Sequence, residues 1–145
     1  MNDPAEVPLF VFADAANVST DNKLNITGIF HFIVGDEFPL AVPTIAMVVQ
    51  LVLSLEAART EHRLEVTLTA LDAVEPMLRA QWTLAPGAPR HMDLPDPRVA
   101  TTIMQHLHGI VFRAPSTYVA RVLLDDVEVR SMPLRVVTRD TYRGD

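Results

Sequence analysis

Hydrophobic and polar residues alternate along much of the chain, which is the pattern of β-strands whose two faces meet different surroundings. The alternation is clearest in residues 63–70, where leucines and a valine share one face and charged or threonine side chains the other. Residues 78–84 repeat it around Trp82, and residues 73–76 supply the turn between the two segments. These segments predict an antiparallel hairpin.

Two more strands are expected near the amino end, at residues 9–15 and 23–33, with the polar residues 17–22 between them. In the second strand the apolar side chains of four residues are expected on one face: Leu24, Ile26, Phe30 and Phe32. Gly28 falls on that face, where a missing side chain indicates a bulge or a close approach of another backbone.

Two segments depart from simple alternation. Residues 45–55 are apolar on both faces, which predicts a central strand covered on both sides, and their valine and isoleucine content favours a strand over a buried helix. Residues 97–107 fit a short helix, because Asp96 precedes Pro97 and apolar residues then recur every fourth position. A strand is the alternative for this segment.

The carboxyl end returns to strands, at residues 110–113, 118–124 and 127–136. Asp125-Asp126 is expected to form a tight turn, because aspartate suits turn positions. Pro133 cannot donate a backbone hydrogen bond, so it predicts an edge strand or a bulge at that point. Seven to eight short strands predict an all-β fold, a two-layer antiparallel, immunoglobulin-like sandwich.

A chain of 145 residues is long enough for one such domain over its whole length. Its hydrophobic fraction of 49% and mean hydropathy of +0.20 are high for a soluble protein. The excess predicts a large core, an apolar surface for self-association, or both. The longest apolar run, residues 45–55, is shorter than the roughly 20 residues that a membrane-spanning helix needs, so no membrane partner is expected.

Charge and cysteine content limit the classes of partner and of functional site that are expected. The net charge is −6, and the acidic residues are scattered between hydrophobic runs. Phosphate-backbone binding needs a clustered positive face, so nucleic acid is not expected as a partner. Cysteine is absent, which excludes disulfides, thiolate metal sites and a cysteine nucleophile. Acidic residues near the amino end disfavour a secretory signal, so a cytoplasmic location is expected.

Several motifs together resemble a family of small bacterial proteins that is known only as a domain of unknown function. The motifs are Leu9-Phe10-Val11-Phe12-Ala13-Asp14, Lys23-Leu24-Asn25-Ile26-Thr27-Gly28-Ile29-Phe30, Phe38-Pro39 with Pro43, and Tyr118 ahead of the hairpin at 122–129. The carboxyl half is also similar to immunoglobulin-like sandwiches, in which a tyrosine opens a strand that leads into a turn. Family members commonly carry glycine before that tyrosine, where this chain has Ser116-Thr117. The resemblance implies a sandwich fold and no activity.

Asp14, Lys23 and Asn25 are expected at facing ends of the first two strands, where they could form a polar cluster. The cluster is interpreted mainly as structural, with Asp14 pairing with Lys23 at the surface or capping a turn. A ligand site is the alternative.

Metal binding is a second alternative. His106 and His108 would point to the same side of a strand, as metal ligands can, although no third ligand is defined by the sequence. Carboxylates from loops could also converge on calcium, although turns favour aspartate for other reasons. The loop acids are Asp36-Glu37, Asp72 with Glu75, Asp93 with Asp96, and Asp125-Asp126.

Function is therefore predicted mainly by exclusion. No sequence motif for nucleophilic, phosphate-dependent or zinc-dependent catalysis is present, so a non-enzymatic protein without a cofactor is expected. Phe38-Pro39, beside Asp36-Glu37, could anchor a protein partner or simply close the end of the core. The leading hypothesis is a protein-interaction module or assembly component, associating with itself as a homo-oligomer or with another protein. A small-ligand or metal-binding sandwich is the alternative.

Overall fold

The structure, a computed structural model, describes residues 5–87 and 98–143. In these residues the chain forms nine strands, one 3-10 helix and a short α-helix. The elements are β1 (Ala5–Val18), β2 (Leu24–Phe30), β3 (Phe32–Gly35), β4 (Leu40–Ser54), η1 (Ala57–Arg59), β5 (His62–Ala70), β6 (Leu78–Leu84), β7 (Arg98–Phe112), β8 (Ser116–Leu124), β9 (Val127–Thr138) and α1 (Arg139–Arg143).

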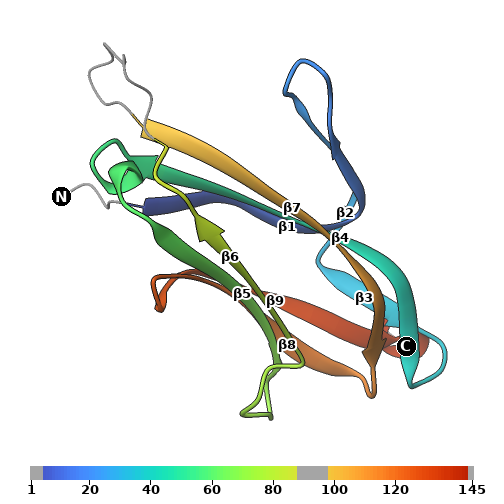
Figure 1. Cartoon of the computed structure of the whole chain (residues 1–145). Helices are drawn as coiled ribbons and strands as arrows, with labels where there is room; N and C mark the ends of the chain where they lie inside the picture. The colour runs from blue at the N-terminus through green and yellow to red at the C-terminus, as the bar shows by residue number, and fades with distance from the viewer. Residues whose placement is uncertain (1–4, 88–97, 144–145) are drawn as a thin grey trace.

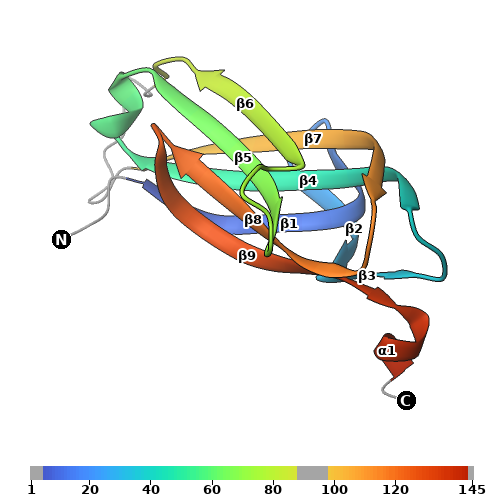
Figure 2. The ribbon, with the colours of Figure 1, turned by 90° about the horizontal axis from the view of Figure 1, so that it is seen from below.

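The strands form two sheets that pack face to face, which confirms the predicted all-β sandwich (Figures 1 and 2). One sheet has the order β2-β1-β4-β7, and the other has the order β3-β9-β8-β5-β6. All neighbouring strands are antiparallel except β3 and β9, which are parallel. The predicted β5–β6 hairpin and the turn at Asp125-Asp126 are both confirmed.

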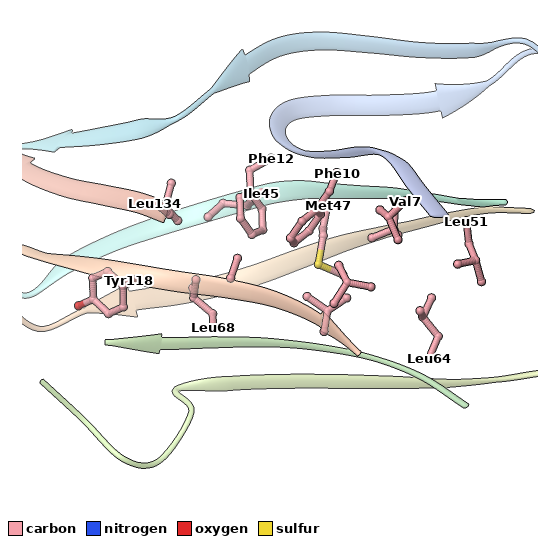
Figure 3. Close-up of a cluster of buried hydrophobic side chains, with 14 of the residues drawn as sticks. Val7, Phe10, Phe12, Ile45, Met47, Leu51, Leu64, Leu68, Tyr118 and Leu134 are labelled. Carbon is pink, nitrogen blue, oxygen red and sulfur yellow. The ribbon is translucent and has the colours of Figure 1, made fainter. Parts of the chain in front are cut away.

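Alternating side chains from both sheets fill the space between them (Figure 3). Phe10 and Met47 project from the four-stranded sheet, and Leu64 and Leu134 from the five-stranded sheet. Each of these side chains is almost completely buried. Burial of such a side chain stabilises the fold by roughly 1.5–3 kcal/mol, so this layer carries most of the driving force for folding.

The outer face of the four-stranded sheet has a second, smaller apolar cluster. Ala46 and Val48 lie on the face of β4 that points away from the core, yet neither has any exposed surface. Leu24 and Ile26 of β2 pack against this cluster, because the end of the β1–β2 hairpin rises on that side of the sheet (Figure 1). The prediction that residues 45–55 form a central strand covered on both faces is therefore confirmed.

The helix considered for residues 97–107 is wrong. From Arg98 onward the chain is β7, which pairs with β4 along its whole length and includes the separate strand expected at 110–113. Val99, Ile103 and Leu107 recur every fourth position because they occupy alternate inward positions of a strand, with polar residues at the inward positions between them. Asp96 and Pro97, which suggested the helix start, lie outside the described residues.

The strand expected over residues 23–33 is divided between the two sheets. β2 ends at Phe30, and after His31 the chain enters β3, which pairs with β9 in the opposite sheet. Phe30 packs against the core, whereas the ring of Phe32 is 43% exposed and lies 5.0 Å from that of Tyr142. The prediction that these residues share one face with Leu24 is therefore wrong. Leu24 packs on the outer cluster and Phe30 on the main core, because the facing of β2 changes near Gly28, whose φ is +71°, and the chain enters the opposite sheet only after His31.

Gly109 marks a change of facing in β7. Its φ angle of +64° lies in the left-handed region that favours glycine, and it stands opposite Pro43, between the pairs Thr44–His108 and Val42–Ile110. Leu107 and Ile110 both pack against the core although they are three positions apart. Regular alternation in β7 therefore extends from Arg98 to His108 and ends at Gly109.

Candidate functional site

His62 is clamped between two acceptors at the end of the sandwich where β8 turns into β9. Its Nδ1 lies 2.6 Å from the Oδ2 of Asp125, and its Nε2 lies 2.5 Å from the carbonyl oxygen of Ala57 in η1. The side chain of His62 is only 13% exposed. Pairing of β5 with β8 brings the two residues together, since Leu64 stands opposite Leu124.

The turn at Asp125-Asp126 places the Asp125 carboxylate beside His62. Both residues have positive φ angles, +51° and +68°, as a two-residue type I′ hairpin turn requires. The Asp125 carboxylate also accepts a hydrogen bond from the backbone N–H of Arg63 at 2.9 Å, and the Arg63 guanidinium pairs with Asp126. The turn is thus attached to β5 by backbone and side-chain contacts.

This arrangement resembles a catalytic His–Asp pair but lacks a free ring nitrogen. A general base must accept a proton from its substrate, and both nitrogens of His62 already face protein oxygens. The doubly donating, protonated form satisfies both acceptors at once. His62 therefore acts as a structural clamp that joins η1, β5 and the β8–β9 turn.

The clamp predicts a specific pH dependence of stability. The Ala57 carbonyl and then Asp125 raise the pKa of His62, so its contribution is complete below the unfolded-state pKa and is lost as pH rises through the higher folded-state value. The Arg63 N–H and then His62 lower the pKa of Asp125, so its contribution is lost as pH falls through the lower folded-state value.

We therefore expect His62→Gln to cost more stability at about pH 5.5, below the unfolded-state histidine pKa of about 6.5, than at about pH 9. Urea unfolding of both proteins at the two pH values measures this difference. Equal losses at both pH values would contradict the clamp.

A cleft of about 460 Å³ opens beside the clamp. Its lining is mostly apolar: Ala5, Leu53, Ala57, Leu124, Val127 and Val129, with His62, Asp125 and Glu128 as the polar members. His62 and Asp125 bind each other, and Glu128 pairs with Arg121 at 3.0 Å. The polar groups of the cleft are therefore engaged within the protein.

Asp14, Lys23 and Asn25, the predicted polar cluster, lie along the β1–β2 hairpin but make separate contacts. Lys23 pairs with Asp21 at 3.3 Å rather than with Asp14, and both of these side chains are largely exposed. Asn25 donates a hydrogen bond to its cross-strand neighbour Asn17 at 3.0 Å. Asp14 stands over Gly28, whose φ is +71°. The hairpin thus provides a structural role for each residue.

The segment Asp36-Glu37-Phe38-Pro39 joins β3 to β4. The Asp36 carboxylate accepts two hydrogen bonds from the Arg139 guanidinium, at 2.6 and 3.3 Å, which connects this segment to α1. Phe38 is half-buried against the core and lies over Gly35, and its peptide bond to Pro39 is cis. The position of Phe38 matches a residue that closes one end of the core.

His106 and His108 lie on the outward face of β7, as expected for a strand. His108 Nδ1 lies 3.4 Å from the Thr44 hydroxyl, and His106 stands opposite Ala46. Across residues 5–87 and 98–143, no group of three histidine, aspartate or glutamate side chains is placed to hold a metal ion. Among the loop acids, Asp93 and Asp96 lie outside the described residues. Metal binding at these positions stays a prediction.

The edge of the four-stranded sheet is the most distinctive surface. β7 has β4 on one side and no second neighbouring strand within the described residues. From Val99 to Phe112 it has no aspartate, glutamate, lysine, arginine or proline. An edge strand presents unpaired backbone N–H and C=O groups, and proteins normally protect such edges with charge or proline.

The other sheet edges are protected in those ways. Arg79 on β6 is 57% exposed and pairs with Glu65 at 2.9 Å. The half of β9 that pairs only with β8 contains Pro133, as predicted for an edge position. β3 has four residues, and β2 belongs to the curled hairpin with Lys23 at its start. Among the described edges, β7 is therefore the long one that has neither charged residues nor proline from Val99 to Phe112. A helix at these residues, as the sequence suggests, would have no such edge.

The fold and these surfaces define an all-β sandwich protein in which, among the described residues, β7 is a long edge strand with no charged residue or proline from Val99 to Phe112. The model of a family of unknown function (DUF6941) matches residues 8–137, and the chain belongs to that family. No curated protein matches the chain.

The chain has a distant likeness to a solved structure, the alkylpurine DNA glycosylase AlkC of Pseudomonas fluorescens bound to DNA containing an abasic site analog. The identity is 10% and the TM-score 0.47, and the likeness covers 92% of this chain but 30% of the glycosylase chain. This likeness carries no functional argument. No helix in the described part of the chain has the length and hydrophobicity needed to cross a membrane.

Proposed function

We propose that the protein is a non-catalytic interaction module that binds a protein strand at the β7 edge. The observation that carries the proposal is the run from Val99 to Phe112, without Asp, Glu, Lys or Arg, on a strand that has a neighbour on one side only within residues 5–87 and 98–143. Addition of an extended segment to a sheet edge is a common mode of protein recognition, in which backbone hydrogen bonds provide affinity and side-chain pockets provide specificity.

The edge is favoured over the two other surfaces considered. The apolar outer face of the four-stranded sheet is partly covered by the protein's own β1–β2 hairpin. The cleft beside His62 has its polar side chains paired internally. By contrast, the open side of β7 has backbone groups that a partner strand could bind.

A fluorescent peptide with the sequence of residues 98–108 tests whether the edge accepts a strand. We expect the peptide to bind the monomeric protein, and Thr102→Lys to weaken binding by roughly tenfold or more, because a lysine on an edge strand disfavours the addition of another strand. Thr83→Lys on β6 is the matched control, since Thr83 and Thr102 are both exposed on edge strands of opposite sheets.

Fluorescence anisotropy measures both affinities. Absence of binding to the monomer, or equal weakening by the two lysine variants, would rule out recognition at β7. A cytoplasmic location and an immunoglobulin-like topology stay predictions.

A further inference from the structure

We infer that the strand which binds β7 is β7 of a second copy, paired antiparallel about a two-fold axis at Ile103. This inference rests on the proposed function and names the partner. It would join the two four-stranded sheets into one continuous sheet, without change to either sandwich.

The evidence is the order of side chains on the core-facing side of β7. The register with β4 places five residues on that side, each opposite a residue of the main core: Val99, Thr101, Ile103, Gln105 and Leu107. This row reads apolar, polar, apolar, polar, apolar, and it is symmetric about Ile103. A two-fold axis there sets Val99 opposite Leu107 of the second copy, Thr101 opposite Gln105, and Ile103 opposite itself.

The symmetry matters because the apolar members of this row are incompletely buried. Val99, Ile103 and Leu107 pack against the core but keep part of their surface exposed at the edge. Directly opposed residues in an antiparallel pair have Cβ atoms about 4.5–5.5 Å apart, close enough for side-chain contact. The two-fold pairing therefore covers all three apolar side chains with apolar partners.

Charge also permits this partner. Each copy has a formal charge of −6, so two copies repel each other overall. In the pairing about Ile103, the residues from Val99 to Leu107 place no like-charged acids or bases opposite one another. Gly109, where the facing changes, lies just beyond the paired segment.

Light scattering over a concentration series tests whether a second copy binds. We expect a mass near twice the 16.1 kDa of one chain at high concentration. Thr102→Lys should return the mass to that of one chain, and Thr83→Lys should leave the dimer intact.

Cross-linking tests the register, and the absence of native cysteine makes the readout specific. Thr101→Cys and Gln105→Cys are made in separate proteins, mixed and oxidised. The two positions stand opposite each other across the inferred axis, so the mixture should form more disulfide-linked dimer than either variant alone. Thr83→Cys should form little linked dimer, and thermal unfolding checks that each variant is folded.

Different results would exclude strand binding at β7 and the second copy as the bound partner. A protein that binds the β7 peptide but has the mass of one chain at every concentration overturns the second copy as partner and leaves strand binding intact. A dimer that survives Thr102→Lys, or that shows no preference for the mixed cysteine pair, overturns the two-fold at Ile103. A monomer that binds no peptide overturns both proposals.

Discussion

Phe10→Ala is expected to lower the free energy of unfolding by about 3–5 kcal/mol, the range for a large aromatic side chain removed from a packed core. The Phe10 ring is 2% exposed and lies 5.6 Å from the ring of Phe12, between the two sheets (Figure 3). Its loss removes buried surface and leaves a cavity that rigid strands on both sides cannot fill.

Urea unfolding of the variant and the wild type measures this loss. Val74→Ala is the control, because Val74 is 94% exposed and its truncation should change stability by less than about 0.5 kcal/mol. A loss at Phe10 as small as that at Val74 would mean that the two sheets do not pack as described.

Gly28→Ala should destabilise the protein by about 1–3 kcal/mol, the usual cost of placing a side chain in a left-handed conformation under additional steric pressure. A Cβ atom at Gly28 would lie 2.8 Å from Cγ of Asp14, and the φ angle there is +71°. The substitution therefore combines backbone strain with a cross-strand clash.

The double variant Asp14→Ala with Gly28→Ala separates the two causes. Removing the Asp14 carboxylate should restore part of the lost stability, because the clash disappears while the backbone strain stays. Gly87→Ala is the matched control, since its φ is ordinary and the nearest atom to an added Cβ is 3.7 Å away. Losses that simply add in the double variant would show that Asp14 does not crowd this position.

The two substitutions act on different parts of the sandwich. Phe10 belongs to the layer that holds the sheets together, and Gly28 to the hairpin that covers the outer apolar cluster. If the hairpin were detached, Ala46 and Val48 would become exposed next to β7. The hairpin thus keeps this sheet face covered beside the edge at which we propose that a partner strand binds.

The His62 clamp lies near the first residues of β7, the proposed binding edge. A small pocket lined by His62, Ala58, Val99 and Thr101, among others, lies between the clamp and the first residues of β7. The Gly87 N–H also donates to the Ala58 carbonyl at 3.1 Å, which ties the end of β6 to η1. The clamp therefore holds the loop elements that border the open strand.

Some features of the candidate sites follow from residues that are close in sequence, whereas others depend on residues that are far apart. Asp125-Asp126 could be predicted as a turn because turn chemistry is local, but its contact with His62 spans 63 positions of sequence. That contact exists only because β5 pairs with β8. For Phe38 the sequence leaves open whether the side chain anchors a partner or closes the end of the core, and its half-buried position over Gly35 matches the second role.

The sequence by itself determined the elements whose signals are local: the alternation of the β5–β6 hairpin, the two-faced apolar run of β4 and the turn at Asp125-Asp126. At Gly28 the sequence predicted a bulge or a close backbone, whereas the structure places the Asp14 side chain there. Tertiary structure alone decided that β7 is a strand, because apolar residues at every fourth position fit both a helix and alternate inward positions of a strand. It also decided that the chain changes sheets at His31. In both places the free energy comes from pairing with distant strands, β4 and β9, which no local pattern specifies.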